Sequence, residues 1–102
     1  MIAHCVMLNL RADHDTGELA QVMKGLAGLV GQIDGFTGFE HGPNIDLEGK
    51  SPDFAAGFVG HFTNRVALET YAADPRHRAL GTRLLALCVS GGITVFDIES
   101  AS

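Results

Sequence analysis

The sequence predicts a single α+β domain in which helices cover one face of a four-stranded sheet. Three observations lead to this prediction: a first segment that is apolar on both faces of a strand, a long helical stripe after it, and alternating strand and helix patterns in the remainder. With 102 residues, 46% hydrophobic and 19% charged, the chain has the composition of a folded protein with one core. We therefore expect one domain over residues 1–102.

The first strand is expected at residues 2–10. Both parities of residues 2–8 are apolar apart from His4. A strand of this kind is typically covered on both sides. We therefore expect it to be central in the sheet.

The first helix is expected to begin after Asp15, an N-cap residue with Glu18 three positions later in the spacing of a capping box. Its apolar residues recur at steps of three and four to about Ile33, which predicts one amphipathic helix. Gly35 is expected to end it.

The later elements follow from the same periodicities. Strands are expected at 36–41, 54–62 and 93–99, helices at 64–73 and 74–89, and a polar connection at 42–52. Gly57 and Gly60 interrupt the second of these strands. Glycine inside a strand often marks close approach of a ligand or a packed segment to the backbone, and a tight bend is the alternative.

The break between the last two helices places a histidine near a tyrosine. Asp74 is expected as an N-cap and Pro75 as the first helical residue. His77 then lies in the first turn, where the helix dipole and two flanking arginines disfavour the imidazolium. Helical spacing directs His77 and Tyr71 toward the interior.

The resulting order, β-α-β-β-α-β with a broken second helix, predicts a ferredoxin-like sandwich whose helices all cover one face of an antiparallel sheet. The other face would expose a large apolar patch if it stayed in water. Twofold pairing of two sheets removes this exposure, so we expect a homodimer.

Charge and hydropathy limit the classes of partner that we expect. Seven basic and twelve acidic residues give a net charge of −5, which argues against nucleic acid and anionic membranes. No apolar run has the length of a membrane span, and the N-terminal segment lacks the features of a signal peptide. We expect a cytoplasmic protein whose partners are small molecules or proteins.

No metal or cofactor is expected. The histidines, among them His41 and His61, lack metal-ligand spacing, and the chain has no phosphate loop, nucleophile elbow or dinucleotide fingerprint. Cys5 and Cys88 are expected to be buried and reduced, with a disulfide as the alternative. Four arginines in and around the last helices predict a solvated face or, alternatively, an anion-attracting rim.

Five segments spread over nearly the whole chain form a characteristic set. They are the opening strand with His4, the Gly42-x-Asn44 turn, the strand ending in Phe62-Thr63-Asn64, the Tyr71-x-x-Asp74-Pro75-x-His77 element, and Val95-Phe96-Asp97. Together they resemble the stress-responsive A/B barrel domain family, and the tyrosine-to-histidine element is the most specific of them. The resemblance implies ferredoxin-like protomers that pair sheet to sheet into a dimeric α+β barrel.

Members of this family that resemble the chain include plant polyketide cyclases, notably olivetolic acid cyclase, in which a pocket between sheet and helices holds histidines and a tyrosine for an aldol condensation. Carried over residue by residue, the resemblance implies a catalytic set of His4, Tyr71 and His77. The chain departs from the cyclases at Ala56, where they have a further histidine, and at Asp74, which replaces the first histidine of the usual His-Pro-x-His.

Three functions follow as alternatives. The first is a homodimeric barrel that binds a small apolar or aromatic molecule. The second is a cofactor-independent cyclase or isomerase in which His77 removes a proton α to a carbonyl and Tyr71 donates a hydrogen bond to the enolate. The third is a structural stress-associated protein with a filled core. An open pocket beside His77 would favour the first two.

Overall fold

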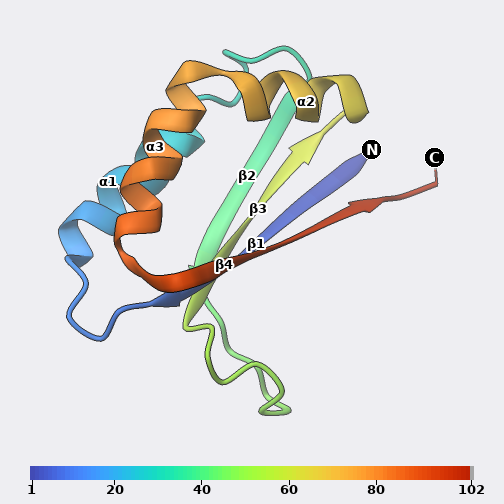
Figure 1. The fold of residues 1–102 in the computed structure, drawn as a ribbon. Coiled ribbons are helices and arrows are strands. Elements are labelled where there is room, and N and C mark those ends of the chain that lie inside the picture. The colour runs from blue at the N-terminus through green and yellow to red at the C-terminus, as the bar shows by residue number, and fades with distance from the viewer. Residues whose placement is uncertain (102) are drawn as a thin grey trace.

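The computed structural model describes residues 1–101 and confirms the ferredoxin-like α+β order (Figure 1). Within these residues the strands and helices are β1 (Ile2–Leu10), α1 (Thr16–Ala27), β2 (Phe36–Pro43), β3 (Ala56–Phe62), α2 (Arg65–Ala73), α3 (Pro75–Ala86) and β4 (Cys88–Glu99). The strands form one antiparallel sheet in the order β2-β3-β1-β4, so β1 is central as expected.

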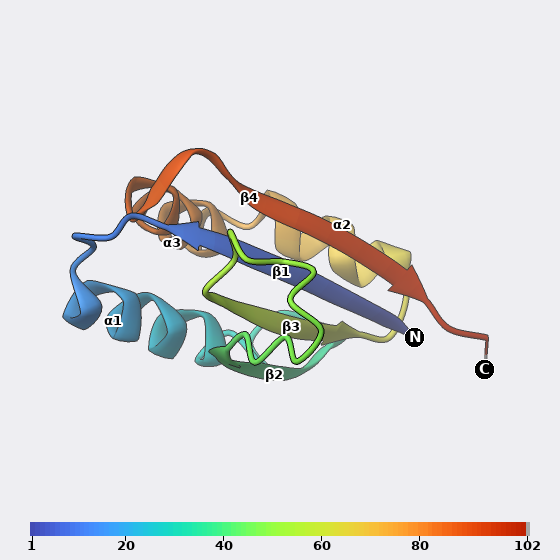
Figure 2. The same cartoon turned by 90° about the horizontal axis from the view of Figure 1, so that it is seen from below.

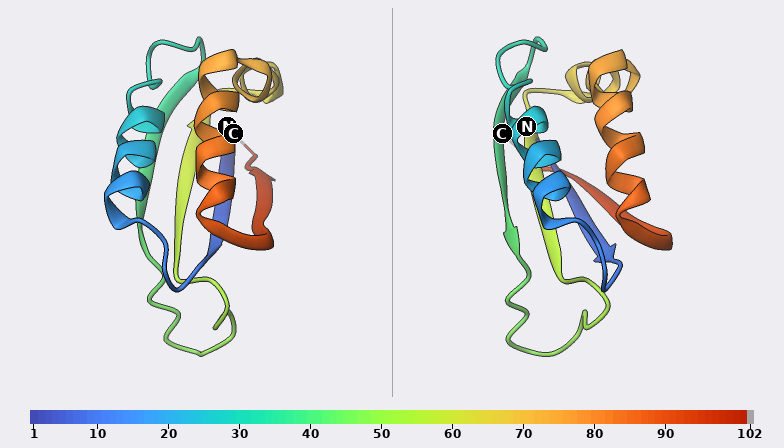
Figure 3. Two further views of the ribbon diagram at one scale, coloured as in Figure 1. Left: turned by 60° about the vertical axis from the view of Figure 1, so that its left-hand side comes forward. Right: turned by 90° about the vertical axis from the view of Figure 1, so that its left-hand side faces the viewer.

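The helices form a single layer on one face of the sheet. Figure 3 shows α1 and α3 side by side across this face, with α1 in contact with β2 and α3 in contact with β4. Figure 2, which shows the molecule from below, places α1 on the β2 side of the sheet and α3 on the β4 side. The core fills the space between the two layers, and its large, fully buried side chains include Tyr71, Phe36, Phe62 and Leu8.

The helices begin where side chains cap them. Asp15 accepts a hydrogen bond from the Glu18 N–H at 3.0 Å, and Asn64 accepts one from the Ala67 N–H at 2.9 Å. Each of these bonds satisfies a backbone donor that has no partner within its helix. The start of α1 predicted at Asp15 is confirmed.

The predicted end of α1 is wrong. The helix ends at Ala27 with Gly28 as its C-cap, and residues 28–35 form turns in place of two further helical turns. Gly31 and Gly35 have φ values of 79° and 80°, a left-handed conformation that stops a helix and that glycine adopts without strain. Ile33 is nevertheless buried. The periodicity therefore reported burial correctly but extended the helix too far.

The boundary between α3 and β4 also differs from the prediction. The helix ends at Ala86, and β4 begins at Cys88, five residues before the expected strand at 93–99. Leu10 pairs with Cys88, and the register shifts before Leu8 pairs with Ile93. Gly91, with φ 68°, lies in this irregular part of the strand. Pairing with the end of β1 makes this segment a strand, although its own sequence has no strand periodicity.

Two other strand ends move by two residues. β2 continues to Pro43, and β3 begins at Ala56, because Pro43 and Ala56 are register partners. Beyond them, Asn44 donates hydrogen bonds to the Phe54 carbonyl at 2.8 Å and to Ser51 Oγ at 2.9 Å. These bonds organise the loop that projects from the sheet at the bottom of Figure 1.

The glycine positions of β3 meet packed side chains. A Cβ built at Gly60 would lie 3.1 Å from Phe62 and 3.4 Å from Phe36, whose rings stack with centroids 4.7 Å apart. A Cβ at Gly57 would lie 2.7 Å from Met7 Sδ. The protein's own atoms therefore make the close approach at both glycines, and at Gly57 they include the Val6 carbonyl oxygen, also at 2.7 Å.

The face of the sheet opposite the helices is partly apolar and uncovered in the single chain. Phe96 and Ile98 of β4 are 60% and 59% exposed there. Cys5 lies on the same face and Cys88 in the core, and both are free thiols. Among residues 1–101, no helix is long and apolar enough to cross a membrane.

Candidate functional site

The break between α2 and α3 brings Tyr71 and His77 together. Asp74 has an extended backbone, ends α2 and caps α3, and its carboxylate accepts a hydrogen bond from the Arg76 N–H at 2.8 Å. Pro75 starts α3 without an unsatisfied N–H. The rings of Tyr71 and His77 have centroids 3.9 Å apart. The helix start predicted at Asp74 and Pro75 is confirmed.

His4 joins this pair from the central strand. Its ring centroid lies 5.8 Å from that of Tyr71 and 6.1 Å from that of Phe62. The three residues proposed from the sequence, His4, Tyr71 and His77, thus form one cluster between the sheet and the helices. We call these three residues the histidine–tyrosine cluster.

Asp97 is a fourth member of this neighbourhood that the sequence-based site did not include. It is the register partner of His4 on β4, and its Oδ1 lies 2.5 Å from His4 Nδ1. Its side chain is 42% exposed and borders a cavity of about 290 Å³ beside α2. A signal was available: His4 and Asp97 are isolated polar residues in apolar segments of strands that the predicted topology makes neighbours.

Burial controls the protonation of the cluster. It lowers the pKa of His77, and positive charge on His4 acts in the same direction, whereas the Ala72 carbonyl and Asp74 oppose the shift without reversing it. Burial also raises the pKa of Tyr71 well above its ordinary range. Near neutral pH, His77 is therefore a neutral imidazole that can accept a proton, and Tyr71 is a phenol that can donate a hydrogen bond.

Burial is one of the causes expected from the sequence to lower the His77 pKa, together with the helix N-terminus and the flanking arginines. Burial dominates the shift, and Arg76 is paired with Asp74 at 2.8 Å. In addition, His77 Nδ1 is buried and has no hydrogen-bond partner among residues 1–101. A buried nitrogen without a partner costs free energy, so its presence requires an explanation.

A separate apolar cavity of about 530 Å³ lies between α1 and the adjoining ends of β1, β2 and β3. Leu8, Leu10, Leu19 and Met23 supply apolar side chains to it, and the small side chain of Ala56 leaves its space open. Among the described residues that line the cavity, none is a carboxylate, lysine or arginine. Its volume is within the range of small-molecule sites, about 300–1,000 Å³.

The cavity is not where the sequence led us to expect it. The residues that line it do not include His4, Tyr71 or His77. Stacked phenylalanine rings, those of Phe36 and Phe62, pack against Tyr71 at centroid distances of 5.1 and 4.9 Å. They fill the space beside the histidine–tyrosine cluster, whereas the opposite end of the same face lacks such rings.

The remaining histidines have other surroundings. His41 lines the cavity, and His61 pairs with Glu40 on the uncovered face of the sheet. His14 Nδ1 lies 2.8 Å from the Arg11 carbonyl. Within the described part of the chain, no group of three or more His, Cys, Asp or Glu side chains is arranged to hold a metal ion.

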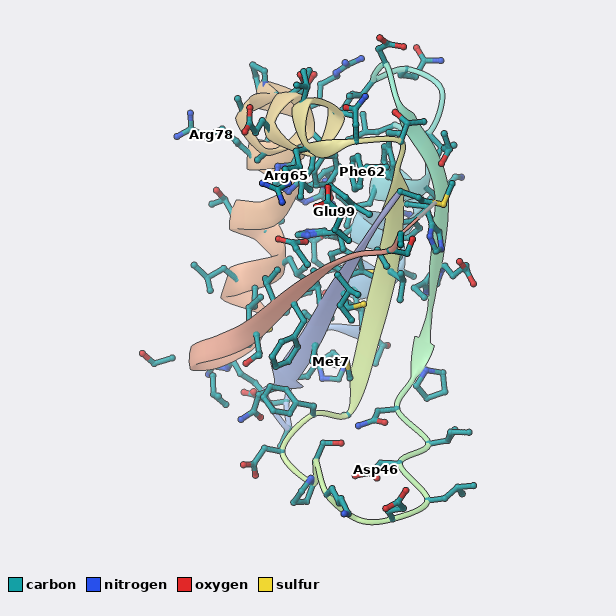
Figure 4. All side chains as sticks on the ribbon, turned by 90° about the vertical axis from the view of Figure 1, so that its right-hand side faces the viewer. Met7, Asp46, Phe62, Arg65, Arg78 and Glu99 are labelled. Carbon is teal, nitrogen blue, oxygen red and sulfur yellow. The ribbon has the colours of Figure 1, made fainter. Side chains whose placement is uncertain are left out.

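The arginines around the last helices are largely paired. Figure 4 shows Arg65 of α2 beside Glu99 at the end of β4, and their closest atoms are 2.8 Å apart. Arg83 pairs with Glu18 of α1 at 2.6 Å. Together with the Arg76 pair, these contacts favour the solvated, ion-paired surface over the anion-attracting rim.

Comparisons with known proteins agree with this architecture. The model of the stress responsive A/B barrel domain matches residues 2–100. A dimeric ferredoxin-like protein of unknown function from Jannaschia sp. CCS1 is 38% identical, with a TM-score of 0.91, over 97% of this chain and 98% of that one. No curated protein sequence matches.

More distant structures share the fold alone. The Arabidopsis thaliana protein At3g17210 is 22% identical, with a TM-score of 0.86, over 100% of this chain and 97% of its own. A hydroxynitrile lyase from Passiflora edulis is 12% identical, with a TM-score of 0.81, over 99% of this chain and 95% of its own. Because the family model spans nearly all of the sequence, the chain belongs to the stress-responsive A/B barrel domain family.

Proposed function

We propose that this A/B barrel domain protein binds a small apolar or aromatic molecule in the cavity beneath α1. The observation that carries this proposal is a partly open pocket of about 530 Å³ whose lining is mostly apolar and holds no carboxylate, lysine or arginine. Concave, mostly apolar pockets of this size are typical of small-molecule sites. The cavity therefore favours a binding function over a purely structural one.

Ala56→Leu tests the proposal, because its side chain faces the cavity between register partners Leu8 and Pro43. Titration with N-phenyl-1-naphthylamine, an uncharged fluorescent aromatic probe, should show saturable binding to the wild type and at least about tenfold weaker binding to Ala56→Leu. Ala79→Leu makes the same change at an exposed position of α3 and should bind like the wild type. Equal binding by all three proteins, or none by the wild type, would refute the cavity as the site.

We also propose that the protein is a homodimer that pairs through the uncovered face of its sheet. Phe96 and Ile98 project from β4 on this face, while a hollow of about 400 Å³ lies on it near Met7 and Val59. Under a twofold axis, projections and a hollow on one face can fit those of a second copy. The dimeric descriptions of the Jannaschia sp. CCS1 protein and a Thermobifida fusca relative support this assembly.

A cytoplasmic location is also proposed. The free thiols of Cys5 and Cys88 are consistent with it, because the cytoplasm keeps thiols reduced.

A second candidate function is cofactor-independent proton transfer α to a carbonyl, as in a cyclase or isomerase. The observation that favours it is the 3.9 Å ring contact between Tyr71 and His77 together with the unpartnered His77 Nδ1. In this reaction the His77 imidazole takes the α-proton, and the Tyr71 hydroxyl donates a hydrogen bond to the enolate oxygen. His4, held by Asp97, also lies next to the Tyr71 ring, with centroids 5.8 Å apart.

Deuterium exchange at the α-carbon of aryl ketones, followed by proton NMR, tests this chemistry without requiring the natural substrate. Catalysed exchange should fall by about 10²-fold or more in His77→Ala and in Tyr71→Phe. Two results would contradict a catalytic role: exchange by the wild type no faster than in buffer, or unchanged exchange in both folded variants. The cluster would then be only a packed part of the core.

A further inference from the structure

The polar side chains of the apolar cavity lie where it opens to solvent. Among the described residues that line it, only Thr16 and His41 have side chains that form strong hydrogen bonds. Both residues are exposed, whereas Leu8 and Met23, at 1% and 3% exposure, are buried. The cavity therefore combines an apolar interior with two polar groups at its mouth.

The His41 side chain lies on the same face of the sheet as the helices. His41 is the register partner of Phe58, which also pairs with Val6 of the core, and directly paired residues project from one face. The His41 ring centroid lies 5.8 Å from that of Phe39, and the Phe39 ring lies 5.2 Å from that of Phe58. His41 also borders the hollow on the uncovered face, but these ring contacts place its side chain on the cavity side.

The hydrogen-bonding groups of both residues are available to a ligand. Other histidines engage protein groups: His4 and His61 pair with carboxylates, and His14 pairs with a backbone carbonyl. Within residues 1–101, neither the His41 ring nor the Thr16 hydroxyl has a partner of this kind. Thr16 begins α1, and His41 lies on β2, which is in contact with α1. The two side chains thus come to the mouth from different layers of the fold.

We propose that the ligand is an aromatic molecule with one uncharged oxygen substituent, and that His41, with Thr16 as the second polar group, binds this oxygen at the mouth of the cavity. This inference rests on the proposed binding function and specifies its ligand class. A neutral imidazole and a hydroxyl each donate and accept hydrogen bonds, so they suit a phenol hydroxyl or a carbonyl. The described lining holds no lysine or arginine to pair with a carboxylate.

The placement of polar and apolar groups also orients the ligand. An oxygen placed against Leu8 and Met23 would lose its hydrogen bonds to water and gain none from these side chains. At the mouth, the same oxygen meets His41 and solvent. A cavity of about 150 Å³ holds benzene, so the 530 Å³ here admits at least two fused rings with the substituent pointing outward.

The test uses naphthalene and 2-naphthol, which differ by one hydroxyl, as competitors of N-phenyl-1-naphthylamine near neutral pH. The measured quantity is the ratio of the naphthalene dissociation constant to that of 2-naphthol, because a general effect of a substitution on the cavity cancels in this ratio. His41→Phe keeps a ring beside Phe39 but removes the hydrogen-bonding nitrogens. It should lower the ratio by about three- to tenfold, the loss expected for one neutral hydrogen bond. Thr16→Val should lower it by a smaller factor.

Two matched variants control for changes away from the cavity. His61→Phe makes the same substitution on the uncovered face of the sheet, and Thr70→Val alters an exposed threonine of α2, so both should keep the wild-type ratio. An unchanged ratio in a His41→Phe protein that still binds naphthalene would overturn the role of His41 and leave the binding function intact. An unchanged ratio in Thr16→Val would remove Thr16 from the site. If neither compound nor the probe binds the wild type, the binding function itself fails.

Discussion

Tyr71 and His77 come from two different helices, yet their rings lie with centroids 3.9 Å apart. The extended backbone at Asp74 separates α2 from α3 and turns both side chains toward the sheet. His77 consequently has a buried nitrogen and a lowered pKa, although its position in a helical first turn adjoins solvent. The cap, the tyrosine and the histidine thus form one structural unit.

The pH dependence of stability should report the neutral state of His77. Its pKa in the folded protein is lowered, so the unfolded chain binds more protons as the pH falls below its unfolded pKa of about 6.5. The stability that neutral His77 provides is present above this pH and is lost on acidification toward its folded pKa. Urea unfolding of wild type and His77→Gln across about pH 5–8 should show a steeper acid loss in the wild type. Parallel curves would contradict this.

Asp74→Ala should lower the melting temperature by about 4–8 °C, the shift produced by losing a typical N-cap in a domain of this size. The fold should remain intact by circular dichroism. Asp74→Asn keeps a capping oxygen without the charge and should recover part of the loss. A melting temperature unchanged in Asp74→Ala would mean that its hydrogen bond to Arg76 N–H adds nothing to stability.

The lowered pKa of the Asp74 carboxylate predicts how folding stability changes at low pH. A hydrogen bond from the Arg76 side chain, with further hydrogen bonds from the backbone N–H groups of Arg76 and His77, lowers the Asp74 pKa to about 2. Burial opposes this shift but does not cancel it. Its stabilising contribution is therefore present above the unfolded pKa of about 3.9 and is lost as the pH falls toward 2. The stability difference between wild type and Asp74→Asn should shrink over this window, measured by thermal unfolding. A difference independent of pH would exclude the charge as its source.

Phe96→Asp should produce a folded monomer. The substitution places a charge on the uncovered sheet face, where a permanent dimer would bury upward of about 2,000 Å² in total. Light scattering coupled to size exclusion at micromolar concentration should give a dimer for wild type and a monomer for the variant. Val66→Asp, at an exposed apolar position of α2, should remain a dimer. A monomeric wild type would refute the proposed assembly.

Gly60→Ala should destabilise the protein by about 1–3 kcal/mol through overpacking against the Phe36 and Phe62 rings. Gly81→Ala is the matched control, because its Cβ would meet no atom within 4 Å and it lies inside α3. That change should stabilise by about 0.5–1 kcal/mol through helix propensity. Equal changes in the free energy of unfolding, measured with urea, would show that the stacked rings leave room for a methyl group at position 60.

Local chemistry in the sequence was sufficient for the element order and the caps. Asp15 and Asp74 each accept a hydrogen bond from a backbone N–H only two or three residues away, so neighbouring residues alone specify these helix starts. The apolar strand 2–10 was recognisable as central because burial on both faces leaves a direct mark on its composition. The grouping of His4, Tyr71 and His77 was available through family resemblance.

Tertiary structure decided the features that depend on residues far apart in the chain. The early start of β4 at Cys88 and the pairing of His4 with Asp97 arise from contacts across the sheet. The cavity lies beside Ala56 and not beside His77, because the Phe36 and Phe62 rings pack around Tyr71 while small residues leave the other end open. Sequence determined which residues face the core, and packing determined which spaces within it remain unfilled, because a void depends on the joint shapes of side chains from several strands and helices.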